Sequence, residues 1–144
     1  MKAEKALFSQ GHGRFEELTP DECVRLLEAK SVGRIAFCGA DGPRVYPVNY
    51  TWWAGSVVFR TAAYNSLATG VRDSAAAFEV DDVDEFLESG WSVLAVGRAR
   101  AVEDSNELAD MWGDRTPEPW APGTRALFIR LVPRQISGRR VHPS

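Results

Sequence analysis

From Gly33 onward, short segments rich in Val, Ile, Phe, Tyr and Trp alternate with clusters of turn residues over most of the chain. Apolar segments of this size, with many β-branched and aromatic residues, are typical of antiparallel strands. The Ala54-Gly55 link is short enough to require a tight hairpin. We therefore predict six strands, near residues 34–38, 44–53, 56–61, 75–81, 91–103 and 125–132.

Three short helices are predicted among these strands. Thr19-Pro20-Asp21-Glu22 combines an N-cap hydroxyl, a proline at the first helical position and a carboxylate three residues after the cap, which predicts a helix over 20–29. Further helices are expected over 65–72 and 105–113, with Ser105 as the N-cap of the second. Six strands with few helices favour a mainly β fold. Because strands this apolar would leave aggregation-prone edges in an open sheet, we expect the six antiparallel strands to close into a barrel with short peripheral helices.

The length of 144 residues fits one domain. We expect residues 1–17 to form a flexible N-terminal arm, because they are polar and show no sustained period, and residues 18–144 to form the domain. A net charge of −3 lacks the basic excess typical of proteins that bind nucleic acid or anionic membranes, so neither partner is expected. Since the sequence has no apolar signal segment and no apolar run of about 18 residues, a cytoplasmic location is expected.

No cluster of acid, base and nucleophile side chains stands out in the sequence. The two histidines, His12 and His142, lie near opposite ends, which disfavours a Ser-His-Asp triad, and phosphate-loop and dinucleotide-binding glycine motifs are absent. The acidic segment 81–85 lacks the spacing of a calcium loop and is interpreted as a solvated turn, so no metal site is expected. Cys23 and Cys38 are expected to be buried free thiols. No catalytic residue is assigned, and any redox chemistry would come from a bound cofactor that the protein orients and shields.

Two segments place polar groups where an apolar strand would otherwise continue. Asn49 interrupts one face of its strand with an amide, which can recognise the edge of a heterocycle or form a cross-strand hydrogen bond. Arg60 and Thr61 close the following strand, and Asn65-Ser66-Leu67 opens the next helix. A guanidinium, hydroxyls and helix-start amides in one small volume favour a phosphate site. The alternative is a plain N-cap at Asn65 and a surface ion pair at Arg60.

Five segments carry a family resemblance by their order and spacing: Val32-Gly33-Arg34-Ile35-Ala36-Phe37, Pro47-Val48-Asn49-Tyr50, Val58-Phe59-Arg60-Thr61, Ala77-Phe78-Glu79-Val80-Asp81 and Gly90-Trp91-Ser92-Val93. Together they resemble the pyridoxamine 5′-phosphate oxidase-like, flavin-binding split-barrel proteins, over about residues 18–141. The resemblance implies a homodimer with FMN bound in grooves between the subunits, and a small-molecule substrate.

The resemblance also implies which residues contact the cofactor. The Val48-Asn49 segment, flanked by Pro47 and Tyr50, would lie along the isoalloxazine edge. The phosphate end would be held by Arg60, Thr61, Asn65, Ser66 and Leu67, and the partner subunit would line the groove with Trp91 and Ser92.

The chain departs from the family pattern at one cofactor position. After the Arg-Thr pair the family usually has Gly-Ser-Lys-Leu, and the matching stretch here is Tyr64-Asn65-Ser66-Leu67, without the phosphate-binding lysine. Loss of one charge-assisted contact would weaken phosphate binding by about 1.5–3 kcal/mol, or roughly one to two decades in affinity. The expected function is a flavin-dependent oxidoreductase acting on an unidentified small molecule, and the alternatives are a deazaflavin-dependent reductase and a non-catalytic carrier module. Vitamin B6 oxidation is not favoured, because an evident substrate-phosphate cluster is lacking.

Overall fold

Seven strands and three short helices make up the described part of the computed structural model, which covers residues 13–62, 66–111, 117 and 127–143. The strands are β1 (Arg14–Glu17), β2 (Val32–Gly39), β3 (Gly42–Trp53), β4 (Ser56–Thr61), β5 (Ser74–Asp84), β6 (Ser89–Ala101) and β7 (Leu127–His142). The helices are α2 (Pro20–Ala29), α3 (Ser66–Val71) and α4 (Ser105–Met111). None of the described helices is long and apolar enough to cross a membrane.

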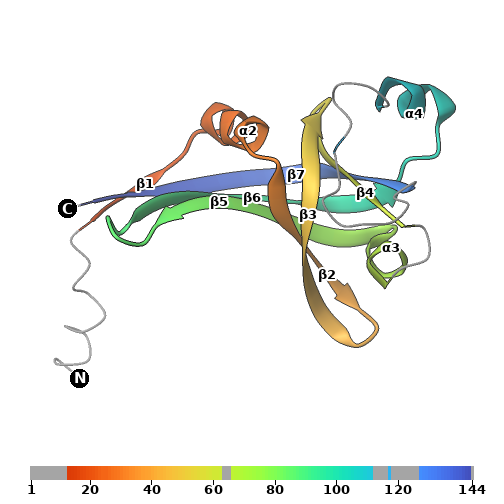
Figure 1. Cartoon of the computed structure of the whole chain (residues 1–144), viewed down its shortest axis with the longest axis horizontal. Coiled ribbons are helices and arrows are strands. Elements are labelled where there is room, and N and C mark those ends of the chain that lie inside the picture. Colours follow the sequence, from red (N-terminus) through yellow and green to blue (C-terminus); the bar gives the residue numbers. More distant parts are fainter. Residues whose placement is uncertain (1–12, 63–65, 112–116, 118–126, 144) are drawn as a thin grey trace.

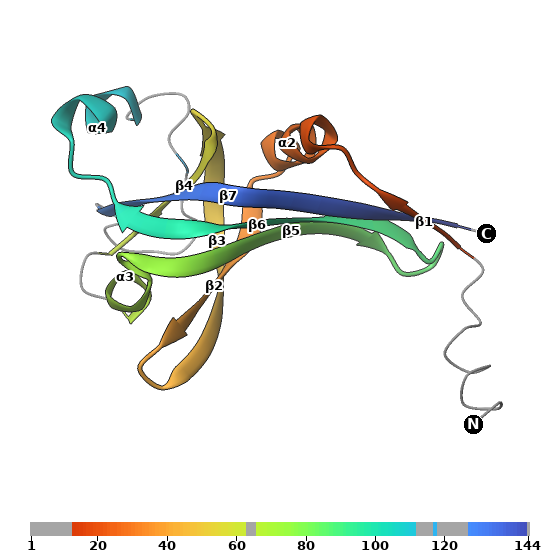
Figure 2. The same cartoon turned by 180° about the vertical axis from the view of Figure 1, so that it is seen from behind.

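Six of the strands close into a ring. The strand order is β1-β7-β4-β3-β2-β5-β6, and β6 also pairs with β7, so that β7, β4, β3, β2, β5 and β6 form a continuous antiparallel barrel. Strand β1 adds to β7 outside the ring. Figures 1 and 2 show β5, β6 and β7 side by side along the long axis, with β2 and β3 crossing them. The predicted six-stranded antiparallel barrel is therefore confirmed.

Alternation along the strands fills the barrel with apolar side chains. Ile35, Phe59, Phe78, Val93 and Leu131 come from five different strands, and each is fully buried in the main core. Their chain neighbours point outward, because successive strand residues face opposite sides of a sheet. This alternation decides which of the predicted site residues can reach a ligand on the outer surface.

The sequence predicted the start of α2 and of α4 correctly, because residues next to each helix determine where it begins. Helix α2 spans the predicted residues 20–29, and its capping box is formed: the Glu22 amide donates to Thr19 Oγ1 at 3.2 Å, and the Thr19 amide donates to Glu22 Oε2 at 2.9 Å. Helix α4 has a different cap from the one predicted. Asp104 Oδ1 accepts hydrogen bonds from the amides of Asn106 and Glu107, both at 2.9 Å, and Ser105 is the first helical residue.

The largest differences from the predicted strands concern β7 and β1. Strand β7 continues to His142, ten residues beyond the predicted end, because its polar second half pairs with β6 and β1. Residues 14–17 of the predicted flexible arm form β1, whose four side chains are all exposed and therefore leave no apolar period in the sequence. His142 Nε2 and Glu16 Oε2 also form a side-chain contact between these strands. Residues 1–12 of the predicted arm lie outside the described residues.

The two cysteines occupy different environments. Cys23 is buried in the main core, as predicted, and Cys38 is exposed, so the prediction of a buried thiol was wrong there. Cys38 follows the buried Phe37 in β2, and strand alternation turns its side chain outward.

Candidate cofactor site

The four predicted residues of β3 divide between the two faces of that strand. Val48 and Tyr50 are 8% and 3% exposed and belong to the main core, whereas Pro47 is exposed and Asn49 half-buried. The Tyr50 hydroxyl donates to the Leu27 carbonyl at 2.6 Å, and burial raises the pKa of Tyr50 well above its ordinary value. The side chains of Val48 and Tyr50 therefore stabilise the barrel interior, and on the outer surface these two residues offer only backbone.

Arg60 and Thr61 also point in opposite directions. Thr61 is 1% exposed and faces the interior, so its hydroxyl does not join Arg60 on the outer surface. The Arg60 guanidinium carbon lies 5.4 Å from the centroid of the Phe128 ring, and Nη1 donates to the Pro117 carbonyl at 3.5 Å. A guanidinium stacked on a ring and bonded to a carbonyl is held in a limited range of orientations.

Asn49 and Arg60 are brought together by the pairing of their strands. The β3–β4 register pairs Tyr50 with Phe59, which places Asn49 and Arg60 at neighbouring positions on the outer face. An amide and a guanidinium side by side can recognise a heterocycle edge and an anionic group respectively. This is the part of the predicted constellation that one chain assembles by itself.

The structure describes only part of the predicted phosphate end at the start of α3. Asn65 lies outside the described residues, and Ser66 is the first residue of α3, five positions after β4 ends. Leu67 is 8% exposed and packs in the main core, so its side chain supports the helix. A role of Ser66 and Asn65 at the phosphate end stays a prediction.

Trp91 and Ser92 are consecutive residues of β6 and so face opposite sides of the sheet. Trp91 pairs with Asp82 and Arg140, packs against the main core, and has Lys30 Nζ at 6.0 Å from its ring centroid. Ser92 pairs with Asp81 and Arg139 on the outer face. Ser92 presents its side chain to the outer surface, whereas the Trp91 ring lies on the opposite side of the strand.

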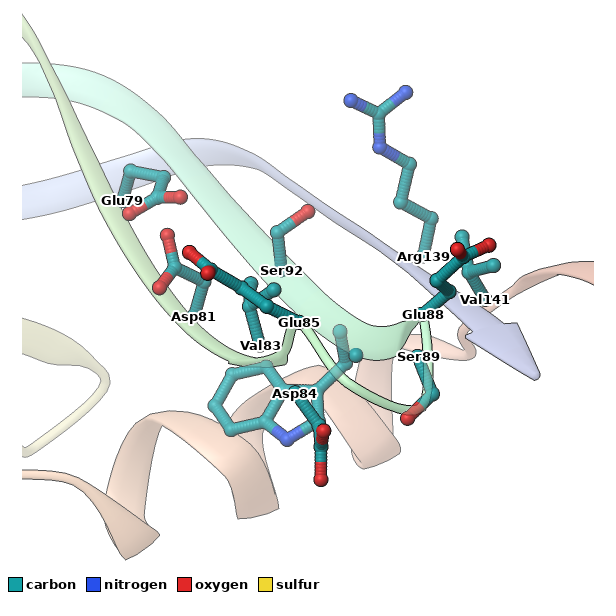
Figure 3. A pocket seen from close by; sticks show the side chains of 12 residues that line it. Glu79, Asp81, Val83, Asp84, Glu85, Glu88, Ser89, Ser92, Arg139 and Val141 are labelled. Carbon is teal, nitrogen blue, oxygen red and sulfur yellow. The ribbon is translucent and has the colours of Figure 1, made fainter. Parts of the chain in front are cut away.

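A groove of about 540 Å³ lies beside Ser92 on the outer face of β5, β6 and β7 (Figure 3). An adjoining hollow of about 690 Å³ shares Glu79, Ser92 and Arg139 with it and reaches Phe15 of β1. In Figure 3, Glu79 and Asp81 lie next to each other on β5, and Arg139 lies on the far side of Ser92. The groove is lined by Glu79, Asp81, Val83, Asp84, Glu85, Glu88, Ser89, Gly90, Trp91, Ser92, Arg139 and Val141.

Glu79 and Asp81 form a charged group with Arg34 that the sequence analysis missed. Arg34 Nη2 lies 2.6 Å from Glu79 Oε1 and 3.1 Å from Asp81 Oδ2. Burial, and a hydrogen bond with Asp81, raise the pKa of Glu79, so this carboxyl holds a proton more readily than a free glutamate does. The signal in the sequence was the alternation of Glu79 and Asp81 with the buried Phe78 and Val80, which places the two carboxyls on one face. Among the described residues, no three His, Cys, Asp or Glu side chains are grouped to hold a metal ion.

Arg60 and Ser92 do not meet within one chain. They lie on β4 and β6, which are not neighbours in the barrel. Their partners on β7, Phe128 and Arg139, are 11 positions apart, which is about 36 Å of strand. The residues predicted to surround the cofactor thus form two separate groups, one around Arg60 and one around Ser92.

An antiparallel barrel of six strands with few short helices is a split barrel, and comparison with known proteins identifies its family. The model of the family described as pyridoxamine 5′-phosphate oxidase matches residues 19–140. The chain belongs to the pyridoxamine 5′-phosphate oxidase family, which confirms the resemblance found in the sequence.

Three relatives illustrate how similar this chain is to other members. The uncharacterized protein Rv0080 of Mycobacterium tuberculosis is 33% identical over 130 residues, which cover 87% of this chain and 84% of that protein. The FAD binding protein of Mycobacterium smegmatis is 33% identical, with a TM-score of 0.74 over 88% of this chain and 98% of its own. A conserved protein of unknown function from Corynebacterium diphtheriae, DIP1874, is 31% identical, with a TM-score of 0.69 over 87% and 96% of the two chains.

Proposed function

We propose that this protein binds a flavin coenzyme on the outer surface of the barrel and acts, as a homodimer, as a flavin-dependent oxidoreductase on a small molecule. Membership of the family and the 33% identity to an FAD-binding protein support flavin binding. The observation that carries the proposal is the placement of Asn49 beside Arg60 on the outer face of β3 and β4.

These residues fit the chemical groups of a flavin coenzyme. The Asn49 amide has both a donor and an acceptor, which suits the mixed donor and acceptor pattern along a flavin ring edge. A guanidinium carries five N–H donors in a planar fork that matches two phosphate oxygens. Phe128 supports the guanidinium from one side, which favours a fixed orientation toward a phosphate.

The bound coenzyme would supply the redox chemistry, through hydride acceptance and donation at its ring. The residues of this chain would bind and orient it: Asn49 at the ring edge, and Arg60 at the phosphate end. Strand β3 would add backbone groups between them. A surface that encloses the ring would also exclude water from the reacting atoms.

The particular coenzyme is FMN or FAD, with a deazaflavin as the alternative. The family resemblance favours FMN, whereas the similar protein from Mycobacterium smegmatis is named for FAD binding. Ser66 stands where the family usually has the phosphate-binding lysine, which leaves Arg60 as the charged group proposed for the phosphate. Titration of the purified protein with riboflavin, FMN, FAD and a deazaflavin, followed by fluorescence, ranks these candidates.

Arg60→Ala tests the proposed site directly. We expect it to weaken FMN or FAD binding about 10- to 100-fold, since a charge-assisted contact contributes about 1.5–3 kcal/mol, and to leave riboflavin binding nearly unchanged. Arg25→Ala, an exposed arginine on α2, is the matched control and should change neither affinity. Equal losses for riboflavin and FMN would contradict the phosphate role of Arg60. An absence of saturable binding to every coenzyme in the series would contradict flavin binding itself.

Turnover separates an enzyme from a carrier module. Steady reduction of an electron acceptor by the coenzyme-loaded protein is expected of the proposed oxidoreductase. Tight binding without any turnover would instead favour the carrier function.

A further inference from the structure

The groove beside Ser92 owes its shape to two small residues of β6. Ser92 and Gly90 both face the outer side of the sheet, because they are two positions apart on one strand. Larger side chains flank them on the two neighbouring strands: Asp81, Val83, Arg139 and Val141. The sheet is therefore hollowed along β6. The groove of about 540 Å³ and the adjoining hollow of about 690 Å³ have the size of small-molecule sites.

One side of Ser92 carries an excess of negative charge. Glu79 and Asp81, which we call the carboxyl pair, both contact Arg34 Nη2, at 2.6 and 3.1 Å. One guanidinium offsets only one of two carboxylate charges. Burial, and a hydrogen bond with Asp81, raise the pKa of Glu79, so the carboxyl pair attracts a further positive charge in the form of a proton. A ligand ammonium group, with three N–H donors, can supply that charge instead.

Arg139 supplies a positive charge on the other side of Ser92. Its side chain is exposed on β7, between Ser92 and Glu17 as cross-strand neighbours. Within the described part of the chain, no carboxylate lies within 4.0 Å of this guanidinium. Figure 3 shows Arg139 on the opposite side of Ser92 from Glu79 and Asp81. A guanidinium in this situation can bind a ligand carboxylate through two parallel N–H···O bonds.

The spacing of the two charged sides fits a zwitterion, a molecule with one ammonium and one carboxylate group. Adjacent strands are about 4.8 Å apart, so the Cα atoms of Asp81 and Arg139 lie about 10 Å apart across β6. In an α-amino acid the charged nitrogen and oxygens are about 3 Å apart, and a charge-assisted hydrogen bond on each side adds about 2.8 Å. One such molecule can therefore contact both sides at once. A ligand with a single charge would leave either Arg139 or the carboxyl pair without a counter-charge.

Apolar side chains border the charged groups on both sides along the strands. Val83, Val141 and Phe15 form the next row across β5, β7 and β1, and they are 63%, 39% and 61% exposed. In the other direction Leu94, which is 41% exposed, follows Ser92 on the outer side of β6. A ligand with an apolar group beside its two charges would cover part of this surface and gain hydrophobic free energy.

We propose that this groove binds a small zwitterion that carries an apolar side group, such as an aromatic α-amino acid. Its ammonium group contacts the carboxyl pair, its carboxylate contacts Arg139, and its apolar group lies on Val83 and Val141. The Ser92 hydroxyl, between the two charged sides, can hydrogen-bond to either charged group. The proposal goes beyond the proposed function, because it concerns a second ligand whose binding requires no flavin.

Four probes that differ by one chemical group test this proposal. L-phenylalanine has all three groups, phenethylammonium lacks the carboxylate, 3-phenylpropanoate lacks the ammonium group, and glycine lacks the apolar group. Isothermal titration calorimetry of the purified protein at neutral pH measures their affinities. We expect phenylalanine to bind about 10- to 100-fold more tightly than either singly charged probe, because each of these lacks one charge-assisted contact. Glycine should bind at least tenfold more weakly than phenylalanine, because it leaves the apolar surface uncovered.

Substitutions on the two sides of Ser92 locate the charged contacts. Arg139→Gln should weaken phenylalanine to the level of phenethylammonium and leave phenethylammonium unchanged. Asp81→Asn should weaken both of these probes and leave 3-phenylpropanoate unchanged, and Glu79→Gln is a second variant of the carboxyl pair. The matched controls, Arg140→Gln and Asp82→Asn, remove the same charges from the next residue of each strand, on the opposite face. They should change each affinity by less than about twofold. Circular dichroism checks folding.

Several outcomes would overturn the proposal. The ligand class is wrong if phenylalanine shows no saturable binding at millimolar concentrations, or if a singly charged probe binds as tightly. The placement is wrong if Arg140→Gln weakens phenylalanine binding as much as Arg139→Gln does, or Asp82→Asn as much as Asp81→Asn. Flavin titration of the same samples keeps the two proposals apart. A protein that shows the expected phenylalanine pattern and binds no flavin would support this proposal and contradict the proposed function.

Discussion

The outer surface of this barrel is built in two ways. Where β4 and β7 meet, α4 covers it, and Val58, Phe128 and Met111 are buried in a second, smaller hydrophobic cluster. Across β5, β6, β7 and β1, the exposed fractions of the apolar residues Phe15, Val83, Leu94 and Val141 lie between 39% and 63%. Both surfaces are apolar strand faces, so both gain free energy when they are covered. Helix α4 covers the first surface, and the second is exposed in the part of the chain that the structure describes.

The two surfaces also differ in how far their arginine side chains are buried. Arg130, with 13% of its side chain exposed, donates from Nε to Ser56 Oγ at 2.8 Å and from Nη1 to Glu107 Oε1 at 3.2 Å, and it lies over the Trp53 ring. Arg34, beside the groove, is 35% exposed and is held by carboxylates alone. The covered surface therefore holds a largely buried arginine, whereas the uncovered one carries an arginine that is about one-third exposed.

The largest expected effect is on the covered surface. Phe128→Ala should lower the free energy of unfolding by about 3–5 kcal/mol, because Phe128 is 1% exposed and its removal leaves a cavity. Val83→Ala should change the free energy of unfolding by less than about 0.5 kcal/mol, because Val83 is 63% exposed. Urea unfolding at low protein concentration measures both. A loss of several kcal/mol for Val83→Ala would show that the two surfaces do not differ as described.

Replacement of each arginine by methionine sharpens the comparison. Arg130→Met should destabilise the fold by about 1.5–3 kcal/mol, because it removes hydrogen bonds from a charged donor in a largely buried network. Arg34→Met should cost less than about 1 kcal/mol, because its ion pairs are one-third exposed and screened by water. Urea unfolding curves at neutral pH provide the values, and the reverse order would refute the distinction.

The smallest expected effect is a pH dependence at Glu79. Burial raises the pKa of Glu79 in the folded protein above the ordinary value of 4.5, so the folded state binds this proton more tightly than the unfolded state. The contribution of Glu79 to stability therefore falls as the pH rises above 4.5, and the loss is complete above the folded pKa. The stability of Glu79→Gln relative to the wild type should accordingly increase with pH over this range. Paired urea curves between pH 4 and pH 8 test this, and a constant difference would contradict it.

Element bounds set by neighbouring residues could be predicted from the sequence, whereas strand bounds that depend on distant pairing could not. The capping box of α2 lies within four residues, and the bounds of α2 agree with the prediction. The second half of β7 is a strand because β6 and β1 pair with it, and its arginines carry no apolar pattern of their own. Strand β1 was missed for the same reason.

The predictions for the candidate site likewise succeeded where local alternation decides and failed where distant strand pairing decides. Strand alternation places Val48 with Tyr50 on one face and Pro47 with Asn49 on the other, and the structure shows that the first pair belongs to the core. The separation of Ser92 from Arg60 depends on how the strands are staggered around the closed barrel, which no local pattern encodes. The grouping of Glu79 and Asp81 with Arg34 likewise requires the β2–β5 register.

The pairing of β1 with the end of β7 has a consequence for protein engineering. Arg14 lies opposite His142, so the first and last described strands run together at one edge, as Figure 2 also shows. A short linker from residue 143 to residue 14 could join these ends, and new ends could be opened at the exposed turn between β2 and β3. Such a circular permutant would keep every strand of the ring in place, and it would move fusion tags away from the edge that β1 forms with the end of β7.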